Sequence, residues 1–310
     1  MSKNKKIEVA IAVAAGITIT AATTYCATCA YIFSKVFKRK KEPLYLSFSN
    51  ALSNKLDNDK WFETVNKAKE WSLNEDDLLL HATSIVNEFE TNKWVINVHG
   101  YGFYGNQIKD VSRAYYDRGY NCLIPDLRAH GESEGKYSYL GSKEKEDILI
   151  WILWILKKDP NAEIVLHGTS IGANAILNAA GEKLPSNVVA IISDSAYSTL
   201  DSLLKFQIGQ YLKLPLNILI PGIKFLLKNK MGMNINDGDT VLKVKSNEIP
   251  TLFIHGENDS FVPYDMVFEL FYANSGVKDM ISYQSSRHAD AFLQQDYFTK
   301  VFEFINRVNS

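Results

Sequence analysis

The feature that most constrains the fold of this chain is a regular alternation of short apolar runs with longer segments of helical spacing. The apolar runs, which are typical of buried strands, cover 93–100, 120–127, 163–168, 187–195, 250–259 and 279–284. A segment with helical spacing follows each of them, and a strand pair over 70–86, with its turn at 74–77, precedes them all. This alternation predicts the α/β class, with a mostly parallel sheet and helices on both of its faces. Ligands bind such sheets at the carboxyl ends of the strands, where this chain also has its polar motifs.

Length and composition agree with one large globular α/β domain or two small ones. The chain has 310 residues, of which 46% are apolar and 22% charged, an ordinary balance for a protein with a packed core. Its formal net charge of −1 gives no reason to expect a nucleic-acid partner. Neither a disulfide framework nor a zinc site is indicated by the three cysteines, Cys26, Cys29 and Cys122.

The N-terminal segment differs in kind from the rest of the chain. One early charge, Glu8, lies in the apolar stretch 7–33, and a helix of that length reaches ~40 Å, against the ~30 Å of a bilayer's hydrocarbon core. A signal peptide cleaved at the small residues 28–30 is the alternative. Against it stands a basic cluster that resists translocation: Lys35, Lys38, Arg39, Lys40 and Lys41. We therefore predict an uncleaved single-pass membrane anchor over 1–34, a linker over 35–60 and a cytoplasmic globular domain.

The stretch "VLHGTSIGAN" (165–174) places Ser170 between two glycines, directly after a predicted strand and before a predicted helix. In that setting the pattern G-x-S-x-G predicts a nucleophile held on a sharp strand-to-helix turn. Gly168 and Gly172 remove Cβ atoms where the two backbones crowd, and the N-terminus of the following helix favours a developing negative charge. The alternative is a glycine-rich turn that contains a serine by chance.

A serine hydroxyl needs a base to take its proton and a carboxylate to orient that base. His288, in "SSRHADAF" after the last strand, is the predicted base, and His130 in "DLRAHGESEG" is the alternative. Asp259, in "HGENDSFVP" after the penultimate strand, is the predicted acid, which gives the chain order Ser, Asp, His. Asp194, after the preceding strand, is its rival. Three further histidines end predicted strands as His-Gly and are interpreted as structural: His99, His167 and His255. A fourth histidine, His81, lies in the early hairpin.

An oxyanion formed at the serine needs two hydrogen-bond donors. One is expected to be the backbone N–H of Ile171, directly after the nucleophile. The other is expected from Tyr101 in "HGYGF", unless the glycines of 100–105 merely form a flexible loop. The loop "DLRAHGESEG" is interpreted as structural, with Asp126 and Arg128 pairing locally.

The motifs "HGYGF", "DLRAHGESEG", "HGTSIGA", "HGENDSFVP" and "RHAD", in this order, resemble those of the serine α/β-hydrolases. The likeness is greatest to bacterial membrane-anchored hydrolases that carry a short helical cap after the sixth core strand, and it covers about 62–308. It implies an eight-stranded sheet with one antiparallel strand. It also implies that the catalytic triad consists of Ser170, Asp259 and His288. The two oxyanion donors that it implies are Tyr101 and Ile171.

A long insertion separates the strand ending at Asp194 from the next one, and we assign a helical cap to about 197–247 within a hydrolase domain over 61–310. A first apolar stripe recurs at helical spacing: Leu200, Leu203, Leu204, Ile208, Tyr211 and Leu212. The stretch 216–227 is almost continuously apolar and is expected to break at Pro221. Either both faces pack on the core, or the cap roofs the nucleophile and binds an acyl chain.

These residues predict a serine hydrolase that cleaves a carboxylic ester through an acyl-enzyme, without metal or cofactor. The expected substrate is a small-molecule or lipid-derived ester with an apolar acyl chain. Because the triad is common to several reactions, a peptidase, a thioesterase and an acyltransferase are the enzymatic alternatives. An inactive hydrolase scaffold that acts as a membrane-tethered binding protein is the alternative from another class.

Overall fold

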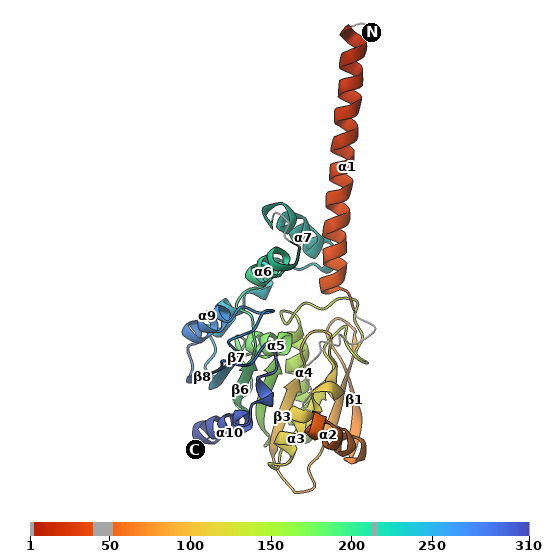
Figure 1. Ribbon diagram of the computed structural model, residues 1–310. Helices are drawn as coiled ribbons and strands as arrows, with labels where there is room; N and C mark the ends of the chain where they lie inside the picture. The colour runs from red at the N-terminus through yellow and green to blue at the C-terminus, as the bar shows by residue number, and fades with distance from the viewer. Residues whose placement is uncertain (1–2, 40–51, 213–215, 310) are drawn as a thin grey trace.

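The structure is a computed structural model that describes residues 3–39, 52–212 and 216–309. A single eight-stranded sheet forms its centre, with helices packed on both faces (Figure 1). The strands are β1 Lys67–Leu73, β2 Leu79–Ile85, β3 Lys93–Val98, β4 Asn121–Pro125, β5 Glu163–Thr169, β6 Val188–Asp194, β7 Thr251–Gly256 and β8 Lys278–Tyr283. The helices are α1 Lys3–Phe37, α2 Leu52–Thr64, α3 Lys109–Tyr116, α4 Glu144–Lys158, α5 Ile171–Ala180, α6 Leu200–Leu212, α7 Leu216–Met231, α8 Thr240–Val244, α9 Asp265–Ala273 and α10 Tyr297–Val308.

The strands are ordered β1-β2-β4-β3-β5-β6-β7-β8 across the sheet. β2 pairs antiparallel with both β1 and β4, and every other neighbouring pair is parallel. In this sheet β2 alone therefore runs against the other strands. The predicted α/β class, the eight strands and the single antiparallel strand are confirmed. Because β3, β5, β6 and β7 are parallel neighbours, the loops that follow them meet at one edge of the sheet.

Side chains alternate between two apolar clusters, one on each face of the sheet. Along β3, Trp94 and Ile96 point into the cluster under α4, α5 and α9, whereas Val95 points into the cluster under α3 and α10. Burial on both faces explains why the strands read as continuous apolar runs. α10 turns Val301 and Ile305, four residues apart, towards the sheet, which is the spacing of one helical face.

Helix α1 extends away from the sheet at its N-terminal end and approaches α7 near its C-terminal end (Figure 1). Within the described part of the chain, no helix combines the length and the apolarity that crossing a bilayer requires. The predicted membrane anchor over 1–34 is therefore not supported. Instead Cys29, Phe33 and Phe37 of α1 are buried against the rest of the protein. A Cβ added to Gly222 of α7 would lie 2.6 Å from the Cys29 Sγ, so the two helices touch closely.

The predicted linker over 35–60 contains more regular structure than its sequence indicates. α1 continues into it, and α2 occupies its C-terminal part. Lys40 and Lys41 of the predicted basic cluster lie outside the described residues. α2 is anchored by Trp61 and Phe62, which pack against the α3 and α10 cluster. Two aromatic side chains at one end of a polar helix give no periodic signal, which is why the helix was not predicted.

Between β6 and β7 the chain forms α6 and α7, on the side of the sheet where the strands end (Figure 1). The Gln207 side chain of α6 donates to the Phe261 carbonyl, in the loop after β7. The side chains of Tyr211 and Leu212 lie outside the described residues, but four members of the predicted stripe are buried: Leu200, Leu203, Leu204 and Ile208.

The predicted break at Pro221 is wrong, because α7 continues through it. Proline removes the N–H that would bond to the carbonyl four residues earlier, and that residue, Asn217, is exposed, so water can replace the donor. The buried face of α7 packs on α1 through Gly222 and Leu219. An N-terminal helix thus covers part of what the sequence predicts as the cap.

Candidate active site

Ser170 occupies the turn between β5 and α5. Its φ of 55° and ψ of −121° fall in a region that L-residues rarely adopt, at a cost of about 1–3 kcal/mol. A Cβ on Gly168 would lie 2.5 Å from the Gly172 carbonyl carbon, and one on Gly172 would lie 2.3 Å from the Val98 carbonyl oxygen. Both positions therefore require glycine. The Ser170 N–H donates to the Asp194 carbonyl at 2.8 Å, which holds the turn in place.

His288 lies in the loop after β8, beside Ser170. Its Nε2 is 2.9 Å from the Ser170 Oγ, and its Nδ1 is 2.7 Å from the Asp259 Oδ2. An ionised carboxylate only accepts hydrogen bonds, so Nδ1 carries the proton and Nε2 is left to accept from the serine hydroxyl. The structure thus brings together the three residues predicted from the sequence as nucleophile, base and acid.

Asp259 is held by donors on both of its carboxylate oxygens. Its Oδ1 accepts the N–H groups of Phe261 and Val262, each at 2.8 Å, and its side chain is fully buried. Burial alone raises the pKa of the Asp259 carboxyl, but His288 and His255 beside it lower that pKa more than burial raises it. The net pKa lies well below the usual range, so Asp259 is an anion at neutral pH.

His255 contacts the site in a way that the sequence analysis missed. It is fully buried, and its Nε2 lies 3.1 Å from the Val262 carbonyl oxygen and 3.2 Å from the Asp259 Oδ2. Since both neighbours only accept, Nε2 carries the proton and His255 is a further donor near the acid. The sequence feature that indicates this contact is the spacing, because His255, at the end of β7, precedes Asp259 by four residues.

Asp194, the rival acid, has different partners. It is buried, and its oxygens accept from the Ser195 hydroxyl at 2.8 Å and the Tyr297 hydroxyl at 3.0 Å. The Ser195 Oγ in turn accepts the Ala289 N–H at 3.1 Å. Burial raises the pKa of Asp194, and the two hydroxyls offset this only in part. Asp194 therefore supports the loop that carries His288, and it also binds the Ser170 N–H through its main chain.

The segments that contain the two predicted oxyanion donors, Ile171 and Tyr101, both border the serine. Ile171 is the first residue of α5, where N–H groups have no intrahelical acceptor. A Cβ on Gly100 would lie 3.4 Å from the Ser170 Cβ, so the residue before Tyr101 borders the nucleophile directly. The turn 100–103 is closed by an N–H···O bond of 3.2 Å, and its third residue is a glycine with a φ of 74°, a conformation that favours glycine.

The alternative base, His130, lies elsewhere. Its Nδ1 donates to the Arg128 carbonyl at 3.0 Å, and its ring packs edge-on against His99 with centroids 5.1 Å apart. Burial lowers the pKa of His130 to about 3, so it is neutral. Burial likewise lowers the pKa of His167 to about 3, and His167 lies between two tyrosine hydroxyls at 3.0 and 3.1 Å. Among the described residues, no hydrogen bond joins His130 to Ser170.

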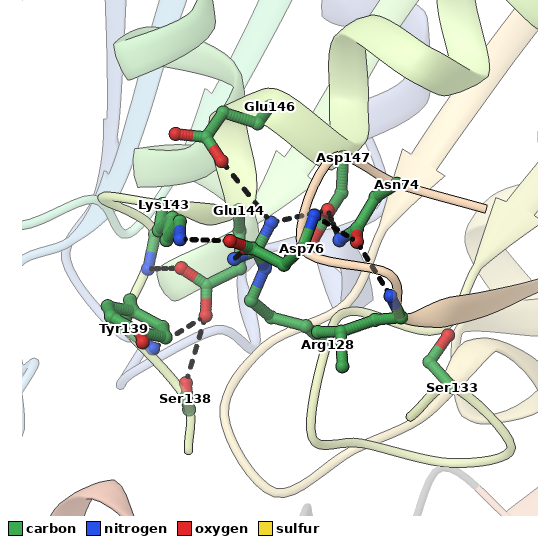
Figure 2. Close-up of polar contacts among 12 residues, drawn as sticks. Asn74, Asp76, Arg128, Ser133, Ser138, Tyr139, Lys143, Glu144, Glu146 and Asp147 are labelled. Atoms are coloured by element: carbon green, nitrogen blue, oxygen red, sulfur yellow. Dashed lines mark hydrogen bonds and ion pairs between the residues drawn. The ribbon is translucent and has the colours of Figure 1, made fainter. Parts of the chain in front are cut away.

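The predicted local pair of Asp126 and Arg128 is wrong. Figure 2 shows Arg128 turned towards α4, where its Nη2 and Nε lie 2.6 Å from the two carboxylate oxygens of Asp147. Its Nη1 bonds to Asp76 at 2.8 Å. Asp126 accepts instead from the His81 Nδ1 at 2.8 Å. Partners from other elements therefore replace the local pair, although the loop is structural as predicted.

Replacing Arg128 by leucine is expected to lower the free energy of unfolding by about 3–5 kcal/mol, because it leaves the buried Asp147 carboxylate without its cation. Asn74, at 2.9 Å, is a neutral donor and does not replace the charge. Chemical denaturation measures the loss. As a control, Arg307→Leu removes an exposed pair with Asp279 and is expected to cost under ~1 kcal/mol. Equal losses in the two variants would contradict this account of the Arg128 cluster.

Two comparisons with known proteins concern the fold of this chain. The family model described as the alpha/beta hydrolase fold matches residues 93–233, which include Ser170. Among solved structures, the esterase Pf2001 of Pyrococcus furiosus superposes with a TM-score of 0.65 at 23% identity, over 87% of this chain and 98% of that one. At that identity the likeness concerns the fold. The chain therefore has the α/β-hydrolase fold, and its residues 93–233 match the model of that family.

Individual relatives are similar over part of their length. Uncharacterized protein YqkD of Bacillus subtilis (strain 168) is 30% identical over 199 residues, which are 63% of this chain and 65% of YqkD. Uncharacterized protein YfhR of Escherichia coli (strain K12) is 26% identical over 198 residues, 63% of each chain. The matched region thus spans less than two thirds of either relative.

Proposed function

We propose that this protein is a serine hydrolase that cleaves carboxylic esters, with Ser170 as nucleophile, His288 as base and Asp259 as the orienting acid. The observation that carries the proposal is the pair of hydrogen bonds through His288, 2.9 Å to the Ser170 Oγ and 2.7 Å to the Asp259 Oδ2. The match of residues 93–233 to the α/β-hydrolase family model and the structural similarity to an esterase support it.

In this mechanism the Ser170 Oγ attacks the ester carbonyl while the His288 Nε2 takes the hydroxyl proton. The buried Asp259 anion holds the imidazole in the required tautomer and stabilises the imidazolium that forms. The N–H groups of Ile171 and Tyr101 bind the oxyanion of the tetrahedral intermediate. His288 then returns the proton to the leaving alkoxide, and a water molecule, activated by the same imidazole, hydrolyses the acyl-enzyme.

For the acyl group of the substrate, we propose an apolar chain that binds beneath α6. Leu203 and Leu204 of α6 belong to the same apolar cluster as Ile171, the residue after the nucleophile, and Val262, which donates to the acid. Phe261 packs against the His288 ring with centroids 4.9 Å apart. Apolar walls with few polar groups are suited to an acyl chain.

With p-nitrophenyl esters, kcat/KM is therefore expected to rise from acetate to about hexanoate or octanoate. Each methylene that the site buries contributes up to ~0.8 kcal/mol, which is roughly fourfold in kcat/KM. Acetate, whose acyl group carries a single methyl, serves as the internal reference. A flat or falling series would contradict the acyl site. Faster cleavage of aminoacyl anilides than of any ester would favour a peptidase on the same triad.

A further inference from the structure

The side chain of Tyr101 reaches the C-terminal turn of α1. Its hydroxyl oxygen lies 2.7 Å from the Val36 carbonyl oxygen and 3.0 Å from the Lys35 carbonyl oxygen. The last four carbonyls of an α-helix lack intrahelical donors and form the negative end of the helix dipole. The Tyr101 hydroxyl therefore caps α1 from a loop that is 65 residues away in the sequence.

Further hydrogen bonds fasten the same turn of α1 to the domain, among them one from the Arg39 N–H to the Lys136 carbonyl at 3.0 Å. The Phe37 carbonyl accepts the Ser138 N–H at 2.8 Å, and Phe37 itself is fully buried. The guanidinium of Arg39, just beyond the helix, donates to the carbonyls of Gly131 and Ser133, each at 2.7 Å. The end of α1 is thus a fixed part of the domain, although the helix extends away from it in the other direction (Figure 1).

The loop that carries Tyr101 borders Ser170. The preceding residue, Gly100, is in close approach to Ser170, since its Cβ would be 3.4 Å from the Ser170 Cβ. One residue therefore connects α1, through its hydroxyl, to the loop that borders the serine. Burial raises the pKa of the Tyr101 hydroxyl well above its usual value, so it remains a donor throughout the pH range in which esterases are assayed.

We propose that the C-terminal turn of α1 positions the turn 100–103, which carries the proposed oxyanion donor, and that the Tyr101 side chain is the positioning group. By holding the hydroxyl, α1 fixes the turn 100–103 and with it the direction of the Tyr101 N–H. This inference rests on the proposed function, in which that N–H binds the oxyanion. It also gives α1 a role in the site, because any displacement of the helix is transmitted to the loop beside Ser170 by this side chain.

The test is Tyr101→Phe in the full chain, which removes the hydroxyl and keeps the backbone N–H. We expect kcat to fall about tenfold, since a displaced donor loses part of the 10²–10³ that one oxyanion donor contributes. KM is expected to stay within about twofold. In an alkyl trifluoromethyl ketone, the carbonyl carbon is attacked by the Ser170 Oγ, whose proton passes to His288, and a tetrahedral oxyanion results. The affinity for this ketone is expected to fall in parallel with kcat. Tyr31→Phe is the matched control, because Tyr31 is exposed on α1, and it is expected to behave as wild type.

A second variant, Arg39→Ala, loosens the same turn of α1 without touching Tyr101. In the wild-type background, we expect Arg39→Ala to lower kcat less than Tyr101→Phe does. In a chain that already carries Tyr101→Phe, we expect Arg39→Ala to leave kcat unchanged, because the hydrogen bond that connects α1 to the loop is then absent. Full kcat and ketone affinity in Tyr101→Phe would overturn the inference. So would a loss confined to KM, or an Arg39→Ala effect of equal size in both backgrounds. If wild type hydrolyses no ester and binds no ketone, the proposed function fails instead.

Discussion

Ser170→Ala is expected to lower kcat for p-nitrophenyl ester hydrolysis by about 10⁴-fold or more. The change removes the Ser170 Oγ, which bonds to the His288 Nε2, and adds no atom to a crowded turn. Alanine has the same Cβ as serine and meets the same backbone strain at φ 55°, so we expect the melting temperature to change by only a few degrees. Initial rates and a thermal melt on the same preparation measure both quantities.

A matched control shows whether the loss of kcat is specific to Ser170 or follows from removing any buried serine hydroxyl. Ser142 is also buried, and its hydroxyl donates to the Tyr139 carbonyl before α4. Ser142→Ala is therefore expected to keep wild-type kcat. Substantial turnover in Ser170→Ala, at normal stability, would show that the nucleophile lies elsewhere.

Asp259→Asn is expected to lower kcat by up to ~10⁴-fold, the loss known for the corresponding change in a well-studied triad. The asparagine amide can donate to the His288 Nδ1, which places the imidazole proton on Nε2. The His288 Nε2 then no longer accepts the Ser170 hydroxyl proton. KM is expected to change little, because the acid does not touch the substrate, and kcat with a p-nitrophenyl ester measures the effect.

Asp194→Asn is the control for the choice of acid. Its carboxylate bonds to the hydroxyls of Ser195 and Tyr297, and hydroxyls can both donate and accept. An amide can therefore keep both contacts, so we expect kcat to fall by roughly tenfold at most. Losses in the reverse order would assign the acid to Asp194.

The sequence predicts the fold well because its signal is local and repeated. Each strand of the parallel sheet is a short apolar run, and the glycines around Ser170 report the crowding of β5 against α5 directly. The single antiparallel strand came only from the resemblance to a family. Pro221 shows the limit of local rules. It lies within α7, and the carbonyl that loses its hydrogen bond belongs to the exposed residue Asn217.

Long-range contacts explain what could not be predicted. Arg128 pairs with Asp147 on α4 and not with its neighbour Asp126, because the burial that selects the partner depends on the assembled fold. The contact of Tyr101 with α1 joins segments that share no periodicity or motif. The long apolar stretch at the N-terminus and the basic cluster after it predict an anchor, and neither feature reveals that Phe33 and Phe37 pack into the domain.

The central claim, that Ser170 is the nucleophile of a serine hydrolase, is tested most directly by reaction with a fluorophosphonate followed by mass spectrometry. The reagent phosphonylates an activated serine and releases fluoride. We predict one adduct per chain, carried by the peptide that contains Ser170, and no adduct in Ser170→Ala. An adduct on another residue, or an unmodified wild-type protein after prolonged exposure, would contradict the claim, and the second result would favour an inactive scaffold that binds a partner.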